Sequence, residues 1–293
     1  MSRAAIDCGT NAIRLLLVDD HGREICRLNR IVRLGEGVDE TGRFLPTAIG
    51  RVEAALSDYV AIMKENGVTA HRMVATSATR DASNREDFFA MTERLLAKPA
   101  EVISGEEEAE LSFRGATASL GDMANPVVID LGGGSTEFVT KDAAYSTQMG
   151  CVRLTERFGL RTEAERAQAR AYVREQLAIM QEHVDIQGIS NVVGVAGTFT
   201  TIAALVLDLD SYDEERIHGA VLPFDGIRAV TQRLIHQTPA ERAQDPRILH
   251  GREDVIGGGC IVIEEVMSLF EQEGIDSLTI SIHDLLDGII TAL

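Results

Sequence analysis

The chain has 293 residues, of which 45% are hydrophobic and 25% charged. This length allows a well-buried core and predicts one large domain or two of ordinary size. Lys and Arg number 28 against 46 Asp and Glu, a net charge of −18, which argues against generic nucleic-acid or anionic-membrane binding. No apolar run could span a membrane and no signal peptide is visible. The four cysteines lack CxxC spacing, which is typical of a reduced, cytoplasmic protein.

The first motif of the chain has a counterpart further along. Residues 5–11 read Ala-Ile-Asp-Cys-Gly-Thr-Asn, and residues 128–134 read Val-Ile-Asp-Leu-Gly-Gly-Gly. Apolar and β-branched residues flank the turn residues, so each segment predicts a strand, an Asp-x-Gly turn and a returning strand. Two such units, about 120 residues apart, predict two related domains.

Between the two turns, helical and strand patterns alternate. Apolar residues at helical spacing and short apolar runs predict helices at about 49–66, 83–97 and 106–120 and strands at 73–76 and 101–104. The sequence Ser83-Asn84-Arg85-Glu86 predicts a capping box at the start of the second helix. We place the domain boundary within 121–125, which gives an N-terminal domain of residues 1–122.

The second half, residues 123–283, continues the alternation. It predicts a helix at 162–183, a strand at 191–196 followed by a helix at 200–207, two or three helices within 224–273 and a last strand at 278–281. We expect the terminal helix, 284–293, to pack back on the first domain. This order of elements favours an α/β fold with mixed sheets.

Three glycine-rich turns are candidate phosphate sites. They are Gly9-Thr10-Asn11, Gly132-Gly133-Gly134-Ser135 and the turn around Gly197-Thr198. A glycine-rich turn after a strand lets backbone N–H groups approach phosphate oxygens, and the third turn opens a helix whose N-terminus favours an anion. A single turn of this kind is usually only a turn, but three of them, two with aspartate at the same offset, favour a binding site. Because the chain is so acidic, a polyanionic ligand must be met locally by cations, arginines and backbone N–H groups.

Carboxylates accompany these turns. Asp7 and Asp130 each end a strand at the turn, and Glu137 lies on the strand that returns from the second turn. Carboxylates beside a bound phosphate require a bridging cation, and hard oxygen ligands indicate Mg²⁺ or Mn²⁺. Alternatively, Asp7 and Asp130 only cap their turns. The run Glu106-Glu107-Glu108 fits an acidic first helical turn, but one of its carboxylates could act as a general base.

Eight segments carry recognisable motifs, and they run in order along nearly the whole chain. They are residues 6–11, 33–38, 75–82, 103–109, 129–137, 149–153, 194–198 and 283–288. In combination these segments resemble the exopolyphosphatase and guanosine pentaphosphate phosphohydrolase (Ppx/GppA) family, which belongs to the actin-like ATPase superfamily.

The resemblance implies two actin-like, ribonuclease H-like domains with the site in the cleft between them. It identifies Glu108 as the catalytic glutamate, Asp130 and Glu137 as the paired metal or phosphate-site carboxylates, and Asp7 with its turn as the first phosphate site. Arg80 becomes a phosphate contact on this basis alone.

The chain also departs from the family pattern. Ala12 replaces a serine, which removes one hydroxyl from the first turn, and Ile282 replaces an acidic residue before the late His-Asp pair. Glu253 stands where a small residue is common. Only nine residues follow Asp284, so the chain resembles the short form without the C-terminal HD-type extension.

The expected activity is release of terminal phosphate from inorganic polyphosphate, with guanosine pentaphosphate (pppGpp) as the alternative substrate. A small-molecule kinase would need an adenosine pocket at 194–201, where we find no clear purine-binding signal. A non-catalytic phosphate sensor would not need intact Asp7, Glu108, Asp130 and Glu137. Neither nucleic acid nor membrane is expected as a partner, and the apolar helices after residue 224 could form a homodimer interface.

Overall fold

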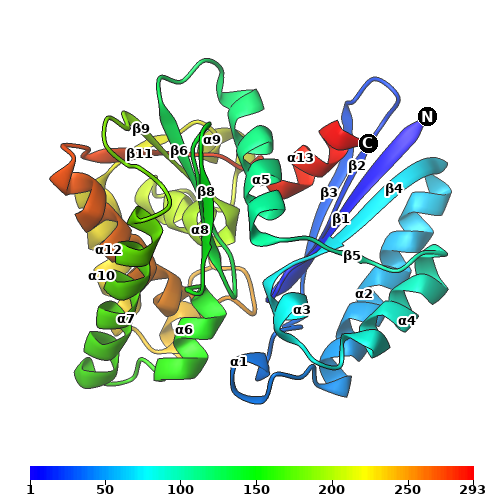
Figure 1. Ribbon diagram of the computed structural model, residues 1–293, viewed down its shortest axis with the longest axis horizontal. Coiled ribbons are helices and arrows are strands. Elements are labelled where there is room, and N and C mark those ends of the chain that lie inside the picture. The colour runs from blue at the N-terminus through cyan, green and yellow to red at the C-terminus, as the bar shows by residue number, and fades with distance from the viewer.

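The computed structural model describes residues 1–293, which form two α/β lobes, each built on one mixed sheet (Figure 1). The α/β fold class with two mixed sheets is therefore confirmed. Two separate apolar cores, of 24 and 41 buried residues, fill the lobes, so each lobe has the core that an independent domain requires. No helix is both long and apolar enough to cross a membrane.

The first sheet has the strand order β3-β2-β1-β4-β5. Its strands are β1 (Ser2–Cys8), β2 (Ala12–Val18), β3 (Glu24–Ile31), β4 (Val68–Ala75) and β5 (Glu101–Val102). The helices of this half are α1 (Val38–Thr41), α2 (Pro46–Glu65), α3 (Ser77–Asp81), α4 (Arg85–Leu96) and α5 (Gly105–Leu120). The strands β1, β2 and β3 are antiparallel, whereas β4 runs parallel to β1.

The second sheet has the order β10-β11-β9-β6-β7-β8. Its strands are β6 (Pro126–Leu131), β7 (Thr136–Val139), β8 (Ala144–Thr147), β9 (Asn191–Val195), β10 (Val221–Pro223) and β11 (Ser277–Ile280). The helices are α6 (Cys151–Phe158), α7 (Glu163–Gln181), α8 (Ala196–Val206), α9 (Glu214–Ile217), α10 (Phe224–His236), α11 (Pro239–Arg242), α12 (Ile256–Gln272) and α13 (Leu285–Ala292). Again three antiparallel strands, β6, β7 and β8, are followed by a parallel neighbour of the first, β9, so the unit around each turn is repeated.

The last helix, α13, lies beside α5 between the lobes and against the first sheet (Figure 1). Residues of both helices share a third apolar cluster of 10 buried residues with β1, β2 and β4. The two helices approach closely at Gly115 and Gly288, where a side chain would overlap the backbone of the other helix. The chain terminus thus returns to the first domain and places Asp284, the residue that caps α13, at the interdomain cleft.

Some local predictions were wrong in detail. The expected capping box at Ser83–Glu86 does not form, because the Ser83 hydroxyl donates to the Gly42 carbonyl and the Asn84 side chain binds the backbone of Phe44. The strand expected at 101–104 ends at Val102, since Ser104 instead caps α5. Tertiary contacts and capping compete with the local pattern in both places.

Candidate active site

The two repeated turns lie directly against each other at the interface of the lobes. A Cβ on Gly133 would lie 2.9 Å from Thr10 Cβ, and a Cβ on Gly134 would lie 2.8 Å from Thr10 Oγ1. Both distances are too short for real side chains, so glycine is required for the two turns to meet. Both turns line one narrow cleft of about 80 Å³.

Most of the residues predicted for the site line this cleft. They are Asp7, Gly9, Thr10, Asn11, Glu108, Asp130, Gly132, Gly133, Gly134, Ser135, Gly197 and Thr198, and Ala12 lies beside them. The structure therefore brings together segments from four separate regions of the chain. Arg80 and Glu137 do not belong to this wall; each lies one layer behind it, against residues described below.

The third turn is the start of α8. The helix begins at Ala196, which has a positive φ of 71°, so Gly197 and Thr198 belong to its first turn rather than to a preceding loop. The guanidinium of Arg252 packs on Gly197, where a side chain on the glycine would overlap it. Arg252 is half-buried and has no carboxylate partner. A helix N-terminus next to an unpaired arginine favours an anion at this point.

Asp7 is tied to the last helix by an arginine that the sequence analysis did not single out. Arg14 of β2 donates to Asp7 Oδ2 through Nε at 2.9 Å and through Nη2 at 2.7 Å, and Nη1 donates to Asp284. Burial raises the pKa of Asp7, although Arg14 opposes the effect. The other oxygen of Asp7, Oδ1, is buried and has no hydrogen-bond partner, so it is free to bind a ligand or a cation.

Of the three consecutive glutamates, only Glu108 faces the cleft. Glu108 is only 7% exposed, and Arg80 Nη1 donates a hydrogen bond to its Oε2 at 2.7 Å. Arg80 is held in turn by the Ile103 carbonyl at 3.0 Å. Glu107 instead points to solvent, where it pairs with Arg72. The sequence left open which carboxylate enters the cleft, and the helix geometry selects Glu108.

The environment of Glu108 makes it a stronger base than an ordinary carboxylate. Burial and the nearby Glu137 raise the pKa of Glu108 to about 8, against the opposing attraction of Arg80. A carboxylate with its pKa moved toward neutral pH can accept a proton and still be partly ionised. Arg80 thus lies where it orients Glu108; its Nη2 is buried without a partner.

Asp130 and Glu137 sit opposite each other on β6 and β7. Asp130 accepts a hydrogen bond from Ser112, and Glu137 Oε1 accepts one from Ser146 Oγ at 2.6 Å. Glu137 Oε2 is buried with no partner. Burial raises the pKa of both carboxyl groups; repulsion from Asp284 raises that of Asp130 further, and repulsion from Asp130 raises that of Glu137. Taken as a pair, the carboxylates of Asp130 and Glu137 therefore do not have all their hydrogen-bond partners within the protein, which fits a site for a cation.

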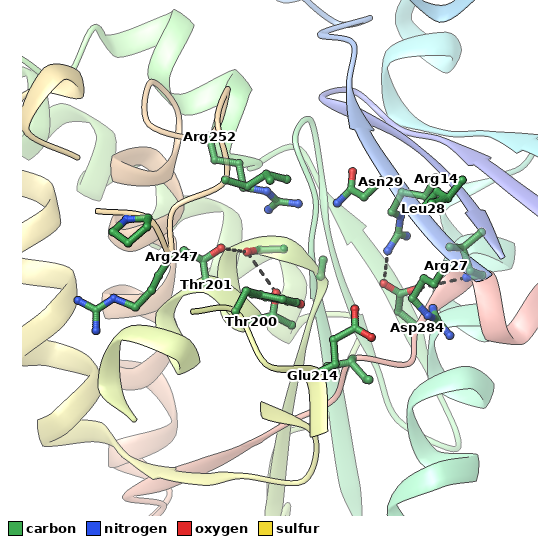
Figure 2. Close-up of a pocket in the computed structure, with 17 residues that line it drawn as sticks. Arg14, Arg27, Leu28, Asn29, Thr200, Thr201, Glu214, Arg247, Arg252 and Asp284 are labelled. Carbon is green, nitrogen blue, oxygen red and sulfur yellow. Dashed lines mark hydrogen bonds and ion pairs between the residues drawn. The ribbon is translucent and has the colours of Figure 1, made fainter. Parts of the chain in front are cut away.

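A larger cavity of about 280 Å³ adjoins the cleft (Figure 2). Arg14, Gly197 and Arg252 line both spaces. In Figure 2, Arg14 and Asp284 stand on the side of the first lobe, opposite Arg252 and the α8 residues Thr200 and Thr201. Ile282, one of the departures from the family pattern, lines this cavity and not the turns.

The other late departure, Glu253, shapes the loop that carries Arg252. Glu253 is 8% exposed, and its carboxylate accepts a hydrogen bond from the backbone N–H of Gly251. Gly251 has a φ of 91° and packs on Ile31 of the first domain. Glu253 therefore stabilises the tight turn before Arg252, which is a role at the cleft rim.

Together, the duplicated fold and the glycine-rich turns that face each other, with buried carboxylates beside them, define a two-lobed α/β protein with a polar cleft between its lobes. The sequence profile of the Ppx/GppA phosphatase family matches residues 17–292. The chain belongs to this family, as the resemblance indicated, and is an enzyme of the phosphatase class.

Individual relatives extend over the same length. Exopolyphosphatase 2 of Mycobacterium tuberculosis is 48% identical, over 99% of this chain and 98% of its own. The crystal structure of an exopolyphosphatase-like protein is 39% identical with a TM-score of 0.96, over 99% of this chain and 98% of that one. An exopolyphosphatase from Cytophaga hutchinsonii is 25% identical with a TM-score of 0.92, over 100% of this chain and 97% of that one. The chain therefore shares the complete two-domain fold of these proteins.

Proposed function

We propose that this protein is an exopolyphosphatase that releases terminal orthophosphate from inorganic polyphosphate by in-line attack of water. The observation that carries the proposal is the position of Glu108, a buried carboxylate held by Arg80 at the wall of a cleft made of glycine-rich turns. A phosphoryl group in those turns would lie within the same small space as the carboxylate. The nearly full-length similarity to two exopolyphosphatases supports the choice of substrate.

The residues of the cleft have separate roles in the proposed reaction. Backbone N–H groups of the two turns and of the α8 N-terminus hold phosphate oxygens. Glu108 orients the attacking water and accepts its proton, as general bases do in phosphoryl transfer. Arg80 keeps Glu108 in place through the hydrogen bond that it donates to Oε2. Thr10 and Ser135, whose side chains lie at the cleft, are suited to hydrogen-bond the transferred group.

A divalent cation fits the carboxylates of the site. No cluster of three or more His, Cys, Asp or Glu residues forms a closed metal cage, but Mg²⁺ commonly binds through one or two carboxylates together with substrate phosphates and water. The partnerless oxygen of Glu137 and the neighbouring Asp130 are the proposed ligands for Mg²⁺ or Mn²⁺. When bound, such an ion neutralises charge on the phosphate oxygens.

The two connected spaces fit removal of the end group of a chain. The 80 Å³ cleft is small, whereas the 280 Å³ cavity beside it is large enough for further phosphate groups. Arg252 borders both and has no carboxylate partner, so it can contact the phosphate next to the one being removed. Exposed ends would therefore reach Glu108, while internal bonds of a long chain would not fit the closed turns.

The decisive test is phosphate release, measured side by side on polyphosphates of graded length and on pppGpp. The proposal expects orthophosphate from polyphosphate, without internal fragments, and slower release from pppGpp. Preferential hydrolysis of pppGpp would overturn the choice of substrate, and internal cleavage products would overturn the exo direction. Action in the cytoplasm and assembly as a homodimer stay predictions, the latter open to sedimentation analysis.

A further inference from the structure

Arg153 of α6 occupies a buried position directly behind the phosphate turns. The residue is only 8% exposed. Its Nε donates to the carbonyl of Gly134 at 2.6 Å, and its Nη2 donates to Asp81 Oδ2 at 2.6 Å and to Ser77 Oγ at 3.3 Å. Its Nη1 donates to Asp39. One guanidinium thus holds groups from both domains.

The partners of Arg153 are parts of the site rather than of the general interface. Gly134 belongs to the second phosphate turn. Asp81 and Ser77 belong to α3, a helix of five residues. The same short helix carries Arg80, whose guanidinium holds Glu108. A displacement of α3 would therefore move Arg80, and with it the carboxylate at the cleft wall.

The chemistry of the position requires arginine. The planar guanidinium donates in four directions here, to two carboxylates, a hydroxyl and a carbonyl, which the single ammonium of lysine could not match. Arg157, one turn later on the same helix, also pairs with Asp39. However, Arg157 is more exposed and contacts neither Gly134 nor α3. The two arginines share an element and a partner, but only Arg153 reaches the site.

We infer that Arg153 is a positioning residue that couples closure of the two domains to the alignment of Glu108, by fixing α3 and the second phosphate turn to each other. The inference rests on the proposed role of Glu108. When the domains separate, Arg153 leaves Asp81 and Ser77, and α3 loses the contact that sets the direction of Arg80. Closure of the domains around substrate would then assemble the site and orient Glu108 in one step.

The test compares the variants Arg153→Met, Arg153→Lys and Asp81→Asn with Arg157→Met as the matched control. Phosphate release from polyphosphate is measured over a range of substrate concentrations, at a temperature where urea titration shows every variant to be folded. Misplacement of a reacting group by about 1 Å can cost about 10²-fold in rate. We therefore expect Arg153→Met to lose about 10²-fold, mainly in kcat, and Arg157→Met to stay within about threefold of the wild type.

A double-mutant cycle separates positioning from simple stabilisation. If Arg153 acts through α3, then Arg153→Met combined with Asp81→Asn should lower kcat no further than Arg153→Met alone. Arg157→Met combined with Asp81→Asn should give additive effects. Equal kcat values for the folded Arg153→Met and Arg157→Met variants, or additivity of Arg153 with Asp81, would overturn the inference. If Arg153→Met does not fold, Arg153→Lys and Asp81→Asn give the same comparison.

Failure of the proposed function would look different. An active Glu108→Gln enzyme would refute the assignment of the base, yet the cycle between Arg153 and Asp81 would still show whether the two act together. Conversely, an inactive Glu108→Gln enzyme with a fully active Arg153→Met enzyme would leave the function standing and refute the coupling alone.

Discussion

Replacing Glu108 with glutamine removes an ionisable carboxyl group from the cleft and keeps the shape of the side chain. The amide oxygen can still accept the hydrogen bond that Arg80 Nη1 donates at 2.7 Å, so the arginine and the Ile103 carbonyl behind it should stay in place. What the variant loses is the ability to take a proton. Any fall in turnover then reports on the chemical step and not on the fold.

The size of the loss follows from the role of a general base. A well-placed base contributes about 10²–10⁴-fold to the rate, which corresponds to about 2.7 to 5.5 kcal/mol of barrier. Glu108 is buried and its pKa is raised to about 8 by burial and by Glu137, conditions that bring a carboxylate near its most effective range as a base. We therefore expect Glu108→Gln to lower kcat by at least about 10²-fold, with little change in KM.

The assay is continuous detection of orthophosphate released from polyphosphate at saturating Mg²⁺, with circular dichroism to confirm the fold. Glu107→Gln is the matched control, because Glu107 is the adjacent residue on the same helix but pairs with Arg72 at the surface. The control should keep its activity within about twofold. A Glu108→Gln enzyme with near-normal kcat would refute the assignment, as would an equal loss in the Glu107→Gln control.

Three further predictions concern the same cleft. Arg80→Met removes the cation that opposes the raised pKa of Glu108, so the acid limb of kcat/KM should move to higher pH; an unmoved limb in the pH profile would contradict this. Gly134→Ala places a methyl group 2.6 Å from Ser77 Oγ and 2.8 Å from Thr10 Oγ1, and we expect phosphate-release assays to show at least a tenfold loss of kcat/KM with a stability cost of only about 1–3 kcal/mol in urea titrations. Burial and Glu137 raise the folded-state pKa of Glu108 to about 8, and the stability that such a group contributes is lost as pH rises from its unfolded-state to its folded-state pKa. The metal-free wild type should therefore become less stable relative to Glu108→Gln between pH 5 and pH 8, by at most about 1.4 kcal/mol per pH unit; urea unfolding at the two pH values measures this, and a constant difference would contradict it.

The sequence predicted the parts of the fold and site that are encoded locally. The two Asp-x-Gly turns could be recognised because apolar strands flank small residues on both sides, and the glutamate run could be recognised as the start of a helix. Which glutamate enters the cleft was not, because that depends on how α5 lies between the lobes. Only the resemblance to known proteins pointed to Glu108 before the structure did.

The missed residues share a different physical reason. Arg14 is a single charged residue inside the apolar strand β2, and its partner Asp284 is 270 residues away in the chain, so no local pattern connects them. Arg252 lies in a loop, and only its packing on Gly197 places it at the site. The start of α8 at Ala196 depends on a positive φ that an alanine does not signal. Long-range pairing and tertiary competition thus account for what the sequence alone could not show.

The net negative charge of the chain opposes the binding of a polyanionic substrate. The arginines of the site are paired unequally with carboxylates, which bears on this problem. Arg14 and Arg80 are matched by carboxylates that they hold in place, so they add little net positive charge. Arg252 is left unmatched at the junction of the cleft and the cavity, whereas Glu137 and Asp7 each keep a buried oxygen without a partner. The cleft is therefore short of positive charge, and under the proposed function a phosphate chain that binds together with Mg²⁺ would supply it. On this argument substrate and metal should bind cooperatively, because each one lowers the electrostatic cost of the other.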